Sequence, residues 1–186
     1  RRGFDVTGLD LSDVLLSYAR RQRDRWPVTY VQGDMRELPF SSDSFDVVLN
    51  LFTSFGYFAE DHENERVLRE IARVLVPNGR FFIDFLNREH VRQHLIPRSE
   101  REENGLTIRE ERQVDGDYVK KTITITEGDH ERIYYERVKM YTHDEMLEMI
   151  ERAGLCVERV LGDYDGMAYA EDASRMIFIG WRSDGR

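Results

Sequence analysis

Residues 4–85 alternate short apolar runs with segments of helical periodicity, and this alternation restricts the fold more than any other feature. The apolar runs, which read as buried strands, cover residues 6–9, 28–31, 45–49 and 80–85. The intervening segments read as amphipathic helices, one from Ser12 to a close at Trp26-Pro27 and another from about Asp61. Such alternation is typical of a parallel sheet with helices on both faces. We therefore predict an α/β fold with a doubly wound, mostly parallel sheet.

Residues 98–141 follow a different pattern, in which polar and apolar side chains alternate along the chain as in a half-buried strand. Turn signals occur at DG (115–116) and EGD (127–129), so the pattern predicts a three-stranded antiparallel meander inserted into the α/β unit. The charged stretch RSEREENG at 98–105 reads as a solvated connection before the first of these strands.

After the meander the α/β pattern returns. Thr142 is placed to cap a further helix that stops at Gly154, and two more apolar runs follow at 156–161 and 176–181. We divide the chain accordingly. The core is predicted at 1–97, the β insertion at 98–141 and the second part of the core at 142–186.

Composition excludes several classes of protein. The net charge of −9 disfavours non-specific binding to nucleic acid or to an anionic membrane. Cys156 is the single cysteine, and the pair His90 and His94 lacks the carboxylate of an H-E-x-x-H motif, so we expect no disulfide and no metal site. No apolar run approaches the roughly 18 residues of a membrane span. The sequence predicts a soluble, cytoplasmic protein.

Polar side chains stand at the ends of the predicted core strands, where doubly wound sheets bind their ligands. Asp10 ends one strand and Asp34 another, with Asn50 and, less centrally, Asp84 at the ends of the next two. A strand-end carboxylate can accept hydrogen bonds from a ribose diol, although Asp10 alone also fits a solvated acid or a helix-terminus partner. A second carboxylate can accept from an exocyclic amine while the neighbouring Met35 lies against an aromatic ring. The pair of acids therefore indicates an adenosine site.

Four motifs in series resemble the class I S-adenosylmethionine-dependent methyltransferases. They are VTGLDLS, VTYVQGDMRELPF, FDVVLNLFTSFGYF and LREIARVLVPNGRFFIDF. Their order matches the family from its second strand to its fifth, and the last two strands fit the family's antiparallel ending. The resemblance implies a Rossmann-like methyltransferase fold and S-adenosylmethionine as the cofactor. LFTSFGYF together with the strand-rich insertion is similar to small-molecule N-methyltransferases, including those that act on amino sugars.

The resemblance also implies roles for individual residues. Asp10 would bind the ribose hydroxyls and Leu11 would pack near the adenine, while Asp34 would face the adenine amino group. The remaining implied cofactor contacts are Gly33 and Met35 around the adenine ring, and Asn50, Leu51 and Phe52 along the methionine half.

One element of the family is absent from the sequence. None of the 13 glycines forms the G-x-G-x-G loop that follows the family's first strand and lets the backbone approach the cofactor. That strand is central in the family's sheet, between the strands that end at Asp10 and Leu51. We therefore expect a gap in the sheet with unpaired edges and exposed apolar faces, and we interpret the sequence as an N-terminally incomplete fragment that lacks about 30 residues or more. The fragment alone is expected to bind cofactor poorly.

The methyl acceptor is expected to be a small molecule, with an amine or a hydroxyl as nucleophile. Phe55 and Tyr57 could line a cage for a cationic amine or could pack under the following helix. In-line methyl transfer mainly needs positioning, so we name no catalytic residue. Two other functions stay open, a nicotinamide-dependent oxidoreductase and a non-catalytic scaffold. The meander residues Tyr134, Tyr135 and Met140 could cover the site or form the seam of a homodimer.

Overall fold

The computed structural model describes residues 3–21 and 28–184, so Trp26 and Pro27 lie outside the described residues. Within them the helices are α1 (Asp13–Arg21), α2 (Asp61–Val74), α3 (Arg88–His94) and α4 (His143–Arg152). The core strands are β1 (Val6–Asp10), β2 (Val28–Gln32), β3 (Phe45–Asn50), β4 (Leu75–Leu86), β9 (Leu155–Leu161) and β10 (Arg175–Arg182). The insertion contains β5 (Arg98–Glu103), β6 (Leu106–Asp115), β7 (Tyr118–Glu127) and β8 (His130–Lys139). No helix of the described residues combines the length and apolar character that crossing a bilayer requires.

The core strands form two sheets. β1 and β2 pair in parallel, and a second sheet has the order β3-β4-β10-β9, in which β10 runs antiparallel to both of its neighbours. Strands and helices alternate as the sequence predicts, and the last two strands form the expected antiparallel ending. The predicted α/β architecture is therefore confirmed.

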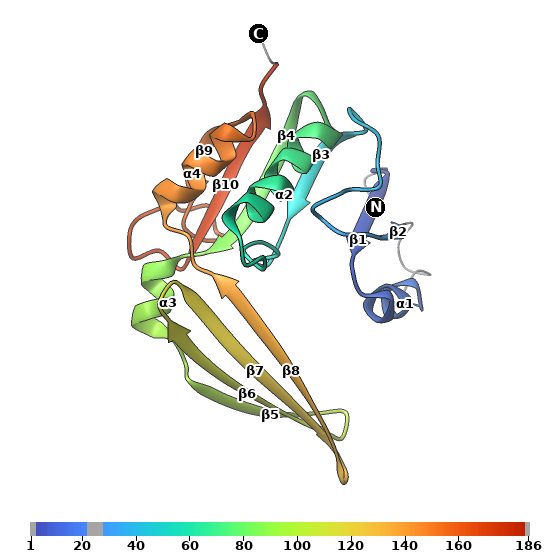
Figure 1. Ribbon diagram of the computed structural model, residues 1–186, viewed down its shortest axis with the longest axis vertical. Helices are drawn as coiled ribbons and strands as arrows, with labels where there is room; N and C mark the ends of the chain where they lie inside the picture. The colour runs from blue at the N-terminus through green and yellow to red at the C-terminus, as the bar shows by residue number, and fades with distance from the viewer. Residues whose placement is uncertain (1–2, 22–27, 185–186) are drawn as a thin grey trace.

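Helices α2 and α4 cover one face of the four-stranded sheet (Figure 1). Their apolar stripes, which include Leu68 and Ile150, pack against Phe81, Phe85 and Phe178 of the sheet to form the main core. The opposite face is open at β3, where Val47 is 53% and Leu49 is 59% exposed. These exposed side chains agree with the apolar faces that the sequence predicts beside the gap in the sheet.

The two core sheets are not joined within the part of the chain that the structure describes. Among the described residues no ladder connects β1 or β2 to β3, so β1 and β3 are both edge strands. Figure 1 shows β1, β2 and α1 set apart from the larger sheet, on the side of β3. Exposed apolar side chains lie near this gap, including Leu11 and Val14 as well as Val47 and Leu49. The gap in the sheet follows the prediction from the sequence.

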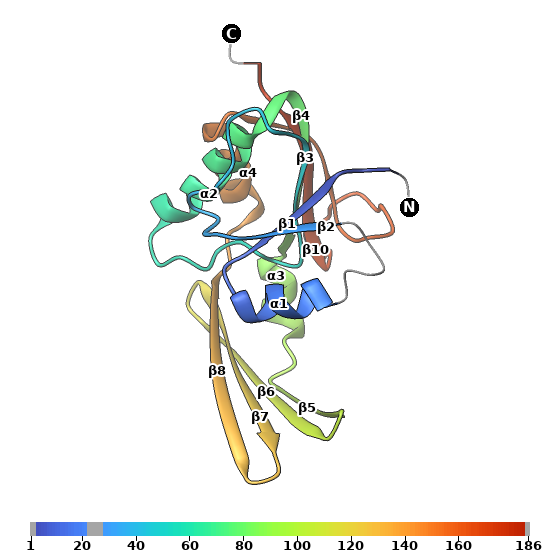
Figure 2. The same ribbon diagram turned by 90° about the vertical axis from the view of Figure 1, so that its right-hand side faces the viewer.

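The insertion is a curved antiparallel sheet of four strands in the order β5-β6-β7-β8, and it extends away from the core (Figures 1 and 2). The predicted number of three strands is wrong because RSEREE forms β5 rather than a solvated connection. Its charged side chains pair across the ladder with those of β6, as in the ion pairs Arg98–Glu111 and Arg109–Glu100. Opposite charges on neighbouring strands stabilise a strand that has no apolar face of its own.

The base of the insertion is fixed to the core by polar contacts around the buried side chains of Tyr141 and Asn64. The Tyr141 hydroxyl donates to Asp61 Oδ1 over 2.7 Å and accepts from Asn64 Nδ2 over 3.0 Å, and Lys139 pairs with the same Asp61 carboxylate. Asn64 is fully buried and also bonds to the backbone of Phe58. These contacts connect the start of α2 with the end of β8.

Candidate functional site

The candidate site lies where β1 and β2 end. Asp10 is paired with Gln32, and the Gly33 N–H donates to the Asp10 carbonyl over 3.1 Å. The Ser12 N–H donates to Asp10 Oδ1 over 2.7 Å and so orients the carboxylate, while Oδ2 has no partner among the described residues. The two predicted acids, Asp10 and Asp34, therefore lie at the same end of a parallel strand pair, as ligand-binding residues of such sheets do.

Asp34 is held by Arg36. The backbone N–H of Arg36 donates to Asp34 Oδ1 over 2.8 Å, and its guanidinium donates to both carboxylate oxygens, with Nη2 2.7 Å from Oδ2. The guanidinium also donates to Glu63 Oε1 over 2.5 Å and lies 4.3 Å from the centre of the Phe58 ring. Because Glu63 belongs to α2, this arginine connects the end of β2 with the main core.

The same contacts keep Asp34 ionised. Hydrogen bonds from the Arg36 side chain, and then from its backbone N–H, hold the pKa of the Asp34 carboxyl below its ordinary value of 3.8. The carboxylate is still one-third exposed, so its remaining lone pairs can accept from a ligand. An acceptor that stays charged at neutral pH suits an exocyclic amine donor.

Replacing Arg36 with alanine is expected to raise the pKa of Asp34 toward its ordinary value, because the variant lacks the guanidinium hydrogen bonds. In the native chain the pKa of Asp34 is lower in the folded state than in the unfolded state. The contribution of Asp34 to folding is therefore complete above about pH 4 and is lost as the pH falls through the folded pKa. Carboxyl-carbon NMR titration measures the shift, with Arg69→Ala, which breaks only an exposed pair with Glu65, as the control. An unchanged Asp34 pKa in the Arg36 variant would contradict the conclusion that the Arg36 guanidinium lowers this pKa.

The neighbours of the two acids have different environments. Met35 is half-buried and packs against the main core, whereas Leu11 is 69% exposed beside Asp10. A Cβ atom on Gly33 would lie 3.0 Å from both Leu9 Cδ1 and Pro39 Cδ, so this position admits no larger side chain without a shift of its neighbours. The backbone between the two acids is thus tightly packed.

The chain that follows β3, residues 51–56, is called the post-β3 segment, and its backbone is unusual. Phe52 and Thr53 take positive φ values of 56° and 60°, which cost non-glycine residues about 1–2 kcal/mol each. The Asn50 amide donates to the Ser54 carbonyl over 2.9 Å, and its buried Oδ1 atom has no partner among the described residues. A buried acceptor without a donor is a natural partner for a ligand N–H group.

The structure separates the two aromatic candidates. Phe55 is 1% exposed and packs edge-on against Phe85, with ring centres 5.7 Å apart, and beside Tyr141. This environment favours the packing interpretation over a role in a substrate cage. Tyr57 is 44% exposed, and burial of its hydroxyl, followed by the nearby Glu136, raises its pKa. Of the two residues, only Tyr57 can contact a ligand from the surface.

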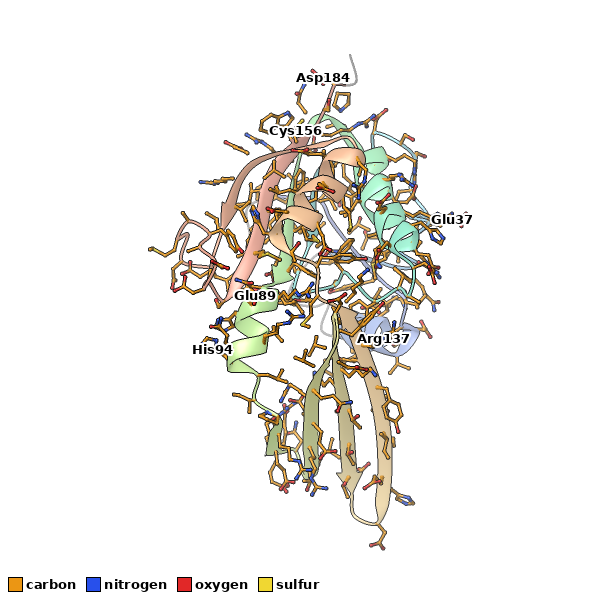
Figure 3. All side chains as sticks on the ribbon, turned by 60° about the vertical axis from the view of Figure 1, so that its left-hand side comes forward. Glu37, Glu89, His94, Arg137, Cys156 and Asp184 are labelled. Atoms are coloured by element: carbon orange, nitrogen blue, oxygen red, sulfur yellow. The ribbon has the colours of Figure 1, made fainter. Side chains whose placement is uncertain are left out.

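His90 and His94 belong to α3 and not to the strand ends that carry Asp10 and Asp34. His90 and His94 stack on each other on α3, with ring centres 4.4 Å apart, and Figure 3 shows His94 at the outer surface. Within the described ranges, no group of three or more His, Cys, Asp or Glu side chains could hold a metal ion.

Sequence reasoning missed the charged partners of the strand-end acids. Arg36 binds Asp34, and Arg175 at the start of β10 binds Asp84, which is fully buried. The spacing of Asp34 and Arg36, two residues apart, was a signal for the first contact. No signal was available for the second, because it depends on the register between β4 and β10.

The first part of the chain is similar to methyltransferases of known sequence. Residues 1–83 match the methyltransferase domain family. A fatty-acid O-methyltransferase of Mycolicibacterium smegmatis is 41% identical over 75 residues, which are 40% of this chain and 26% of that protein. The chain thus spans about a third or less of the length of the curated relatives it matches.

Solved structures match over nearly the whole chain. An S-adenosylmethionine-dependent methyltransferase of Clostridium acetobutylicum has a TM-score of 0.85 at 15% identity, covering 97% of this chain and 76% of that one. CalS10, an amino pentose methyltransferase of Micromonospora echinaspora solved with S-adenosylmethionine bound, has a TM-score of 0.67 at 22% identity, covering 96% and 74%. Residues 1–83 are therefore similar to the methyltransferase domain family, and the fold is similar to that of these S-adenosylmethionine-dependent methyltransferases.

Proposed function

We propose that the whole protein transfers a methyl group from S-adenosylmethionine to a small-molecule acceptor. The observation that carries the proposal is the pair of carboxylates at the ends of β1 and β2, with Asp34 held ionised by Arg36. Two fixed acceptors at adjacent strand ends suit the two donor groups of adenosine, the ribose diol and the exocyclic amine. The methyltransferase domain match over residues 1–83 supports the same reading.

The residues fit the cofactor as follows. Asp10, whose Oδ2 has no partner in the described part of the chain, accepts from the ribose hydroxyls, and Asp34 accepts from the adenine amino group. Leu11 and Met35 border the ring, and Gly33 keeps the backbone between the acids close-packed. The methionine half lies along Asn50, Leu51 and Phe52. There the buried Oδ1 atom of Asn50 accepts from its ammonium group.

The sulfonium supplies an activated methyl group, so the chain mainly positions the reactants for an in-line displacement. We propose a small-molecule acceptor with an amine or hydroxyl nucleophile. The relatives include both kinds of chemistry, an amino pentose methyltransferase and a fatty-acid O-methyltransferase. Tyr57, which is exposed beside the post-β3 segment, is the aromatic surface that an acceptor would meet.

Titration calorimetry on the whole protein tests this function. S-adenosylhomocysteine, the product form of the cofactor, is expected to bind, and NAD+ and NADH are not. Binding of a nicotinamide dinucleotide in its place would support an oxidoreductase. Absence of binding by all three ligands would support a scaffold without catalysis. Either result would overturn the proposal.

We also propose that the insertion mediates a homodimer. β8 is an edge strand that carries the exposed apolar residues Ile133, Tyr134 and Tyr135, and such edges pair readily with another copy. Sedimentation velocity of the whole protein is expected to show a dimer that Tyr135→Lys shifts toward monomer, with Lys120→Ala on the neighbouring strand as the control. A monomeric native protein would contradict this arrangement.

A further inference from the structure

Asp84 is a fully buried carboxylate at the carboxyl half of β4. Its side chain accepts three hydrogen bonds and forms an ion pair. Oδ1 accepts from Arg175 Nε over 2.8 Å and lies 2.6 Å from the ion-paired Arg175 Nη2, while Oδ2 accepts from the Tyr164 hydroxyl over 2.6 Å and from the Phe52 N–H over 2.8 Å. A buried charge is tolerated only with such a complete set of partners. The cluster of Asp84, Arg175 and Tyr164 therefore joins β4, β10 and the β9–β10 loop to the segment after β3.

Three hydrogen bonds connect Asp84 and Arg175 to Phe52 and Thr53, the two residues of the post-β3 segment with positive φ values. Asp84 accepts from the Phe52 N–H through its side chain and from the Thr53 N–H through its carbonyl, the latter over 3.0 Å. Arg175 Nη2 donates to Thr53 Oγ1 over 2.9 Å. Backbone in this conformation persists only when its surroundings hold it. The cluster supplies that restraint from outside the segment.

Hydrogen bonds within the β9–β10 loop hold the backbone around Tyr164, whose hydroxyl contacts Asp84. Asp163 Oδ1 accepts from the N–H groups of Asp165 and Met167, over 2.9 and 3.0 Å, and the Gly162 N–H donates to the Met167 carbonyl over 2.8 Å. The Tyr164 ring is 60% exposed, yet its hydroxyl reaches the buried Asp84. The loop thus presents one hydroxyl to the cluster while most of the ring stays at the surface.

We propose that Asp84, Arg175 and Tyr164 are positioning residues for the methionine half of the cofactor. They fix Phe52 and Thr53, and through them the direction in which the chain leaves Asn50. The inference rests on the proposed function, because it assigns the post-β3 segment to the cofactor. It goes beyond that function by separating two halves of the site, one organised by Arg36 and the other by Arg175.

The test compares two ligands on the whole protein. Arg175→Lys keeps the charge but loses the forked contact with Asp84 and Thr53, and Tyr164→Phe removes one hydroxyl from a largely exposed ring. Each variant is expected to weaken S-adenosylhomocysteine binding about three- to tenfold. This is less than the loss of a direct hydrogen bond to a charged group, because the effect reaches the ligand through the segment. Adenosine, which lacks the methionine half, is expected to bind both variants within about twofold of the native value.

Two matched controls separate positioning from stability. Arg182→Lys alters an ion-paired arginine at the opposite end of β10, and Tyr169→Phe removes a hydroxyl from the same loop as Tyr164. Neither is expected to change the affinity for either ligand when all proteins are measured well below their unfolding midpoints. Equal loss of both ligands in the Arg175 and Tyr164 variants, or loss of neither, would overturn the inference. Failure of the native protein to bind S-adenosylhomocysteine would instead remove the proposed function, and the inference with it.

Discussion

Replacing Asp34 with alanine is expected to weaken binding of S-adenosylhomocysteine to the whole protein by about 10- to 100-fold. The variant loses a hydrogen-bond acceptor that is ionised at neutral pH, and such bonds contribute about 1.5–3 kcal/mol. It also leaves the Arg36 guanidinium, which binds Asp34 through both Nε and Nη2, with Glu63 as its remaining acidic partner. Titration calorimetry measures the change.

The control for this variant is Asp129→Ala. Asp129 lies in the turn between β7 and β8, at the far tip of the insertion (Figure 1). Its removal changes the net charge by the same amount and leaves the ends of β1 and β2 intact. An Asp34 variant that binds as tightly as the native protein would remove this carboxylate from the cofactor site.

Gly56→Ala is expected to lower the free energy of unfolding by about 2–4 kcal/mol, the sum of backbone strain and steric overlap. Gly56 has a φ of +84°, and a Cβ atom there would lie 2.8 Å from the Lys139 carbonyl oxygen and 3.2 Å from Val138 Cγ1. The Gly56 carbonyl also accepts from the Lys139 N–H over 2.8 Å, so the two backbones cannot separate without losing that bond. Urea unfolding of the whole protein measures the loss.

Gly128→Ala is the matched control for this prediction. Gly128 also has a positive φ, of +57°, but a Cβ atom there meets nothing within 4 Å. Only the backbone cost applies, about 1 kcal/mol. If the two variants lost the same stability, the close contact between the post-β3 segment and the end of β8 would not be a source of constraint.

The core was predictable because its periodicity is strong. Buried parallel strands and amphipathic helices leave distinct patterns, and α2 shows this in the burial of Val67, Leu68 and Ile71 on one side. The strand β5 was not predictable in the same way, since its sequence is almost entirely charged. It pairs with β6, the next strand along the chain, through ion pairs whose partners are set by the register of the two strands.

The site was predictable at the strand ends and not beyond them. Asp10 and Asp34 follow from a general rule of open α/β sheets. The contacts of Arg175 depend on the register of β10, and the burial of Phe55 depends on how Phe85 and Tyr141 meet. These tertiary contacts cannot be predicted from the local sequence. From the sequence alone, an aromatic residue such as Phe55 therefore fits equally well a role in binding the substrate and a place in the hydrophobic core.

The most direct test of the account is a crystal structure of the whole protein with S-adenosylhomocysteine bound. The account predicts that Asp34 accepts from the adenine amino group, that Asp10 accepts from the ribose hydroxyls and that Asn50 Oδ1 faces the ammonium group. A cofactor bound away from the ends of β1 and β2, or one whose adenine makes no contact with Asp34, would contradict it.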